Sequence, residues 1–223
     1  MSLVEWNPAG EGWQRLSEEW RAKTPEVVAQ ERTIYIEMFE KNILVLDVYR
    51  TLLHRLLKRQ QAKPTRAALL TGQPGTGWSV FLSSAMAALI ELPPGKSTWL
   101  YFLLVYLLAR GDDILFYIPG RFLLFRGDQV HKSSHITVVP KSTASTPGSQ
   151  TWCLIDPDGP LETPPRVLFE GGRLFPIQAC SPNREKIQGW FKQRRPIVYG
   201  MPLWNRQDLL AGYARHHTDL RYV

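Results

Sequence analysis

The chain has 223 residues and a mass of 25.6 kDa, which is enough for one domain with an extension and for a substantial hydrophobic core. Hydrophobic residues make up 44% of it and charged residues 21%, a composition that excludes a collagen and a coiled coil and argues against disorder. The formal net charge is +7, but the excess of lysine and arginine is spread along the chain, so a nucleic-acid partner stays open without being indicated.

Two further classes of protein are not expected. Cys153 and Cys180 are the only cysteines and form no CxxC pair, so neither a disulfide framework nor a thiolate zinc site can be assembled. The apolar stretches 79–92 and 99–109 are each shorter than the ~18–20 residues of a membrane-spanning helix, and Lys96 lies between them. We interpret both as core helices and expect a cytoplasmic protein without a membrane partner, a nuclear location being the alternative.

The first part of the chain, residues 1–64, is expected to be a helical N-terminal extension. Thr24-Pro25-Glu26 has the form of a helix start, with an N-cap, a proline at the first helical position and an early acid. Asp47 can cap a second helix, whose apolar residues recur at three- and four-residue steps and which ends before Pro64. These helices are candidates for docking a protein partner.

The remaining residues, 65–223, alternate between short apolar runs and helical segments, which is typical of an α/β domain with a mostly parallel sheet. We therefore predict a three-layer α/β domain whose sheet has about five strands. The predicted strands are 67–71, 114–118, 152–156, 175–180 and 197–201, and the predicted helices are 98–110, 184–194 and 205–216.

A glycine-rich loop follows the first of these strands. Gly72-Gln73-Pro74-Gly75-Thr76-Gly77 is the first half of the motif GxxxxGK(S/T), in which backbone N–H groups surround a β-phosphate and the lysine reaches the β- and γ-phosphates. Trp78 stands where the lysine belongs, and the second half appears further on as Gly95-Lys96-Ser97-Thr98. Removing the 18 residues 78–95 restores GQPGTGKST. We interpret them as a recent insertion or a translated intron, which sequencing of the transcript would test.

With this loop, residues of about 43–216 resemble the P-loop NTPases of the additional-strand, AAA/STAND-like type, and more narrowly the fungal P-loop proteins of the retrotransposon-hot-spot or Crinkler type. The resemblance rests on Tyr49, on GQPGTG…KST with the following WLYFLLVYLL, and on the segments WCLIDPDG, IQACSPNREKIQGWFKQ and MPLWNRQDLL. It implies a switch or slow ATPase that binds ATP and Mg²⁺. The residues it places at the nucleotide are Gly72, Gly75, Thr76, Gly77, Lys96, Ser97, Thr98 and Ser181.

The resemblance also implies roles for residues at the ends of two strands. Asp156 would hold Mg²⁺ through water and Ser97 would hold it through its hydroxyl, although Asp156-Pro157-Asp158-Gly159 can also be a simple turn. Pro157 stands where many such ATPases have a glutamate that orients the attacking water, which leaves Asp158 as the catalytic candidate. Ser181 or Asn183 could sense the γ-phosphate, or either could cap the next helix.

The interruption of the loop predicts weak nucleotide binding and doubtful hydrolysis. The helix that begins at Lys96 is more apolar than the stretch 79–91, so we expect it to pack against the sheet. We also expect Lys96 to lie away from the amides of residues 72–77. The family normally continues into a helical lid with an arginine at the nucleotide, which we expect to be missing here. The alternative is a protein-interaction module that needs no nucleotide.

Overall fold

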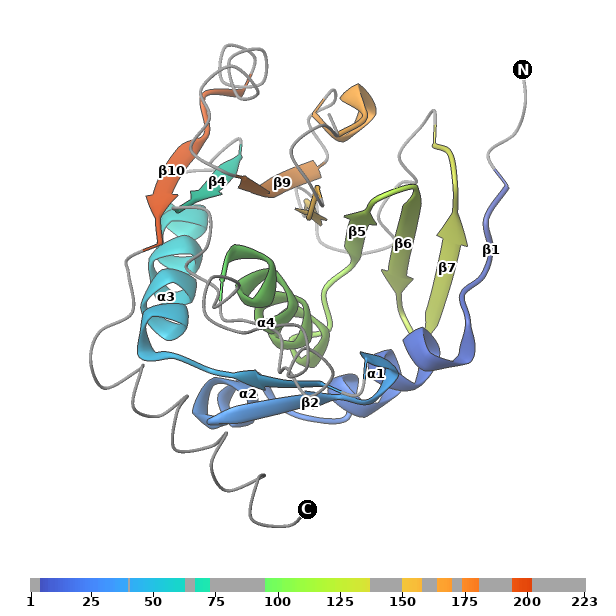
Figure 1. The fold of residues 1–223 in the computed structure, drawn as a ribbon, viewed down its shortest axis with the longest axis horizontal. Coiled ribbons are helices and arrows are strands. Elements are labelled where there is room, and N and C mark those ends of the chain that lie inside the picture. Colours follow the sequence, from blue (N-terminus) through green and yellow to red (C-terminus); the bar gives the residue numbers. More distant parts are fainter. Residues whose placement is uncertain are drawn as a thin grey trace, which may run out of the picture.

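The computed structural model describes residues 5–39, 41–62, 67–72, 95–136, 150–157, 164–169, 174–180 and 194–201 (Figure 1). Their helices are α1 (Glu11–Arg21), α2 (Pro25–Gln30), α3 (Asp47–Ala62) and α4 (Lys96–Ala109), with 3-10 turns η1 (Glu37–Phe39) and η3 (Arg166–Leu168). Their strands are β1 (Asn7–Pro8), β2 (Thr33–Ile36), β3 (Lys41–Leu44), β4 (Ala68–Thr71), β5 (Ile114–Ile118), β6 (Arg121–Arg126), β7 (Gln129–Ser133), β8 (Thr151–Ile155), β9 (Leu174–Cys180) and β10 (Ile197–Gly200).

The main sheet has eight strands among the described residues, in the order β1-β7-β6-β5-β8-β9-β4-β10. The five neighbours β5, β8, β9, β4 and β10 are parallel, and each lies within one residue of a strand predicted from an apolar run. Every residue of β8 is buried, as expected for a parallel strand covered on both faces. The mixed α/β class and the mostly parallel sheet are therefore confirmed.

The sequence analysis missed the antiparallel flank of this sheet, in which β5, β6 and β7 follow one another as hairpins and β1 pairs with β7. Each hairpin has a two-residue loop that contains glycine, Pro119-Gly120 in the first and Gly127-Asp128 in the second. Gly120 and Gly127 have φ angles of 68° and 51°, which a residue with a side chain rarely adopts. These loops are the sequence signal that could have revealed the flank.

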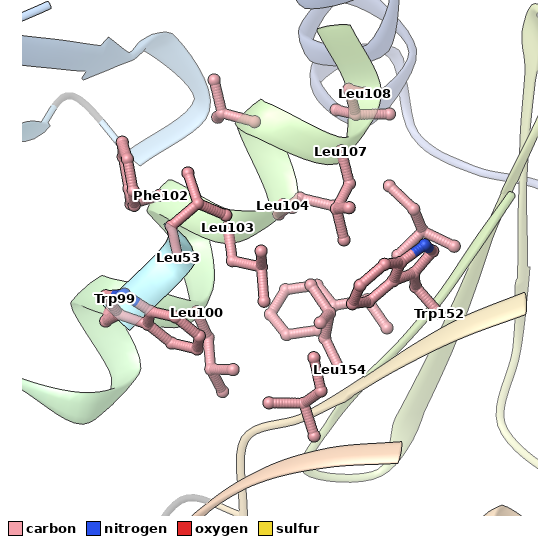
Figure 2. Packing of buried hydrophobic residues seen from close by; sticks show 14 of the residues in the cluster. Leu53, Trp99, Leu100, Phe102, Leu103, Leu104, Leu107, Leu108, Trp152 and Leu154 are labelled. Carbon is pink, nitrogen blue, oxygen red and sulfur yellow. The ribbon is translucent and has the colours of Figure 1, made fainter. Parts of the chain in front are cut away.

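Helix α4 lies between the sheet and the N-terminal elements, at the centre of the molecule (Figure 1). It contacts β5, β8 and β9 on one side and α1, α2 and α3 on the other, which is why its sequence is apolar all round. Figure 2 shows Leu100, Leu103, Leu104 and Leu107 of α4 in the same buried cluster as Trp152 of β8. The expectation that the helix beginning at Lys96 packs against the sheet is confirmed.

Successive side chains of each strand point to opposite faces of the sheet. In β8, Trp152 and Leu154 belong to the cluster that includes α4, while Cys153 and Ile155 belong to a second cluster on the opposite face. The turn η3 contributes Leu168 to that second cluster. The predicted helix 205–216, and 184–194 apart from Arg194, lie outside the described residues, so the third layer stays a prediction.

The described residues of the N-terminal extension are mainly helical, as predicted, but they also contain strands that the sequence analysis did not predict. Helix α2 begins at Pro25 as predicted, and α3 begins at Asp47, the residue predicted to cap it, but β2 and β3 form an antiparallel pair between them. In β2, buried Ile34 and Ile36 alternate with exposed Tyr35, the period of a strand covered on one face. No helix in the described part of the chain is both long and apolar enough to cross a membrane.

Candidate functional site

The candidate site lies at the carboxyl-terminal edge of the parallel strands, where ligands bind in open α/β sheets. Thr71 at the end of β4 is opposite Cys180 at the end of β9, and Gly72 follows β4 directly. Asp156 follows β8, and its backbone N–H donates to the carbonyl of Tyr117 at 3.0 Å, one step beyond the β5–β8 ladder. The first turn of α4 meets this edge.

Ser97 and Asp156, the two predicted metal-binding residues, are in direct contact. The Ser97 hydroxyl donates to Asp156 Oδ1 at 2.9 Å, although the residues are 59 positions apart in the sequence. Ser97 is exposed and Asp156 is half-buried, so solvent reaches this pair. Carboxylate and hydroxyl oxygens are the kind of ligand that Mg²⁺ takes, and Mg²⁺ usually keeps several waters and needs few protein ligands. The pair is therefore chemically suited to a hydrated Mg²⁺ ion.

Lys96 lies next to this pair, with its ammonium at the beginning of the glycine loop. Its Nζ donates to the carbonyl of Gly72 at 3.1 Å. Burial lowers the pKa of Lys96, and the nearby Cys180 thiol and Asp156 carboxylate oppose that effect. The expectation that Lys96 lies away from the loop is wrong at the first glycine, because α4 begins directly beside the end of β4. The other residues of the loop, 73–77, lie outside the described residues.

Gly72 occupies a place where a side chain would be crowded. A Cβ atom added to it would lie 3.2 Å from Met201 Cβ and 3.4 Å from the Met201 carbonyl oxygen. Met201 is itself held there, because its N–H donates to the carbonyl of Thr71 at 2.7 Å. The close approach of the chain after β10 thus gives the first glycine of the motif a packing role in addition to any contact with a ligand.

Two other predicted or adjacent residues have more buried positions. Thr98 is only 2% exposed, so little of its surface is left for a ligand. Cys180 is half-buried at the edge of the site, and burial raises the pKa of its thiol to about 11, against the opposing effects of Lys96 and Thr71. A thiol with that pKa is neutral near pH 7, which agrees with its interpretation as a small apolar residue.

The remaining predicted site residues lie outside the described residues. They are Gly75, Thr76, Gly77, Asp158 and Ser181. Their roles at the nucleotide and in catalysis stay predictions.

Tyr49 is a residue at this site that reasoning from motifs missed. Its hydroxyl donates to the carbonyl of Gly95, the residue before Lys96, at 3.3 Å. The indole N–H of Trp99 donates in return to the carbonyl of Tyr49 at 3.2 Å. In the sequence Tyr49 was only one residue of the family resemblance, because no spacing rule connects residues 46 positions apart.

These features define a mixed α/β protein with a polar cluster at the carboxyl end of its parallel strands. Over 171 residues, 76% of its length, the chain is 25% identical to Crinkler effector protein 15 and to Crinkler effector protein 16 of Phytophthora infestans. The match covers 24% of each of these proteins, so the chain spans about a quarter of the length of the curated relatives it matches. Phytophthora infestans is an oomycete, and the expected fungal affiliation is not supported. No family model and no solved structure matches the chain.

Proposed function

We propose that this chain is a P-loop-type domain that binds ATP with Mg²⁺ and acts as a switch or slow ATPase, with its metal-binding half assembled and its phosphate loop interrupted. One observation carries the proposal. The Ser97 hydroxyl lies 2.9 Å from Asp156 Oδ1, where the 14-residue helix α4 begins at the carboxyl edge of the parallel strands. A simple turn after β8 would not require a hydroxyl from a distant helix at this carboxylate.

The order of the strands supports the same class. Strand β9 lies between β4, which leads into the glycine loop, and β8, which leads to Asp156. A strand inserted between these two is the additional strand after which the class is named. Strand β9 thus separates the end of β4 from Asp156 at the end of β8. Helix α4 lies across β9, and its Ser97 reaches Asp156.

Lys96 and the first turn of α4 supply positive charge for a phosphate. The free N–H groups at the start of a helix and the helix dipole attract anions, and Lys96 adds a full charge at the same end. Its ammonium bonds the neutral carbonyl of Gly72, a partner that a phosphate oxygen can replace with a stronger, charge-assisted bond. Lys96 therefore lies at the amino-terminal end of α4, where the motif requires a lysine for the β- and γ-phosphates.

The interruption and Pro157 limit what the site can do. Residues 78–95 separate Gly77 from Lys96, so the backbone amides and the lysine of the motif are no longer joined in one continuous loop. Pro157 has no carboxylate to polarise an attacking water. We therefore expect weaker binding than in a chain without residues 78–95, and slow hydrolysis in both.

The test is a titration with a fluorescent ATP analogue, with Mg²⁺ or with EDTA, on the full chain and on a variant lacking residues 78–95. We expect saturable, Mg²⁺-dependent binding that is tighter in the shortened chain. Asp156→Asn should remove most of the Mg²⁺ dependence at an almost unchanged melting temperature. Asp128→Asn is the matched control, because Asp128 is an exposed carboxylate in the β6–β7 turn.

Two results would contradict the proposal. Binding that ignores both Mg²⁺ and Asp156→Asn would mean that the metal site is misassigned. If neither the full chain nor the shortened one binds the analogue, the nucleotide-independent interaction module takes the place of this function.

A further inference from the structure

Tyr49 of α3 contacts the first turns of α4 in three ways. Its hydroxyl donates to the Gly95 carbonyl at 3.3 Å, its own carbonyl accepts from the Trp99 indole at 3.2 Å, and its ring packs against Phe102 with centroids 6.0 Å apart. Tyr49 is fully buried and Trp99 is nearly so. The two hydrogen bonds run in opposite directions between the same two helices, so neither helix can shift along the other without breaking one of them.

The bond to Gly95 acts on the peptide group that leads into Lys96. The Gly95 carbonyl also accepts from the Trp99 N–H at 3.0 Å, which is the first hydrogen bond of α4. Its two lone pairs are thus both in use. Because a peptide group is planar, fixing the Gly95 carbonyl also fixes the N–H of Lys96 and the direction in which the helix begins.

A side-chain cap is missing where this bond is made. Gly95 occupies the N-cap position in an extended conformation, and as a glycine it has no side-chain oxygen to accept from the first amides of α4. Packing against Phe102 would be satisfied by a phenylalanine, and a buried hydroxyl without a partner is costly. The Tyr49 hydroxyl therefore has a role in orientation that its ring does not explain.

Helix α3 is itself tied to the preceding helix, next to Tyr49. The Arg50 guanidinium donates to the carbonyls of Ala29 and Glu31, each at 2.7 Å, at the end of α2. It also pairs with Asp47 at 2.7 Å, in the first turn of α3. The N-terminal elements thus hold the turn of α3 that carries Tyr49 in a fixed place.

We infer that Tyr49 is a positioning residue for the phosphate-binding end of α4, and that its hydroxyl aims Lys96 at the glycine loop and Ser97 at Asp156. The inference rests on the proposed function for its consequence in nucleotide binding. It assigns to the N-terminal extension a part in the site, which the motif residues alone do not require.

The test compares Tyr49→Phe with Tyr106→Phe. The second change removes a hydroxyl from α4 itself, near its carboxyl-terminal end. In the nucleotide-free full chain, hydrogen exchange of the amides from Trp99 to Phe102 should be about 2- to 10-fold faster in Tyr49→Phe, the loss of one hydrogen bond. The fluorescent ATP analogue with Mg²⁺ should bind more weakly by a similar factor. Tyr106→Phe should change neither quantity.

The outcomes separate this inference from the proposed function. If the unmodified chain binds the analogue and Tyr49→Phe leaves both exchange and affinity unchanged, the inference is wrong and the proposed function stands. If the unmodified chain and the chain without residues 78–95 both fail to bind, the proposed function is wrong, while unchanged exchange in Tyr49→Phe would separately overturn the positioning role of Tyr49. Should Tyr49→Phe not fold, Trp99→Phe removes the other hydrogen bond between α3 and α4, and unchanged exchange and affinity in that variant would contradict the inference that this contact positions α4.

Discussion

The two ends of α4 both gather charged groups, but they bond them differently. At the amino-terminal end, the Lys96 ammonium bonds the neutral Gly72 carbonyl and the Asp156 carboxylate accepts from the neutral Ser97 hydroxyl. At the other end, Arg110 Nε lies 2.5 Å from Asp112 Oδ2, so a guanidinium meets a carboxylate directly.

The difference distinguishes the polar cluster at the amino-terminal end from a structural ion pair. An ion pair such as Arg110–Asp112 satisfies both charges within the protein, and Arg21 adds a bond to the Asp112 carbonyl at 3.0 Å. A charged group whose hydrogen-bond partner is neutral can exchange that partner for a ligand of opposite charge and form a stronger, charge-assisted bond. Two helix ends of similar polarity can therefore have different uses, and the bonding partners distinguish them.

The largest expected effect is a loss of nucleotide affinity when the positive charge is removed at the amino-terminal end of α4 but not at the other end. In the chain lacking residues 78–95, Lys96→Ala should weaken the ATP analogue about 10- to 150-fold, the worth of a hydrogen bond to a charged group. Arg110→Ala should leave the affinity unchanged. In the full chain the effect of Lys96→Ala should be much smaller, because the interrupted loop binds phosphate poorly. An equal loss in both backgrounds, measured by fluorescence titration, would mean that residues 78–95 do not disturb the site.

The amino-terminal end also shows how much the sequence could predict. The phosphate-loop motif and the family resemblance predict that Ser97 and Asp156 lie at one metal site, and the structure brings the two side chains together. The strands of the parallel sheet were predictable because buried strands read as continuous apolar runs. The position of Lys96 was not, because distance along the chain says nothing about where a helix begins relative to a strand. The hydrogen bond from the Tyr49 hydroxyl has a backbone carbonyl as its acceptor, and a pattern of side chains in the sequence does not reveal such a partner.

A second prediction concerns Gly72, which packs closely against Met201 beside the amino-terminal end of α4. Gly111, just beyond the other end of α4, has no such close neighbour. Gly72→Ala places a Cβ 3.2 Å from Met201 Cβ and should destabilise the fold by about 1–3 kcal/mol, the usual effect of overpacking. Gly200→Ala is the control, because Gly200 is opposite Thr71 in the neighbouring strand and has open space at its Cβ position. Urea denaturation of both variants measures the difference. A stable Gly72→Ala would show that Met201 yields easily.

A third, smaller effect is expected at the carboxyl-terminal end. Asp112→Asn removes the carboxylate that pairs with Arg110, and both side chains are more than one-fifth exposed. We expect a loss of at most about 1 kcal/mol in the free energy of unfolding, as for a partly exposed ion pair. Nucleotide affinity should not change, and a titration alongside the denaturation experiment would show it. A clear loss of affinity would remove the distinction between the two ends.

The smallest effect is a pH dependence that Lys96 contributes at the amino-terminal end. Burial lowers the pKa of Lys96 below its usual value near 10.5, so between the two values the unfolded chain binds the proton more strongly than the folded chain. The contribution of Lys96 to stability should therefore rise as the pH rises through this interval. The difference in unfolding free energy between the unmodified chain and Lys96→Met measures it together with the Cys180 thiol, whose pKa Lys96 influences, because groups that do not interact with Lys96 titrate equally in both. Nucleotide affinity should change in the opposite direction, falling as Lys96 loses its proton. Lys96→Arg keeps its charge throughout and should flatten both profiles, and profiles that stay unchanged in Lys96→Arg would show that another group causes them.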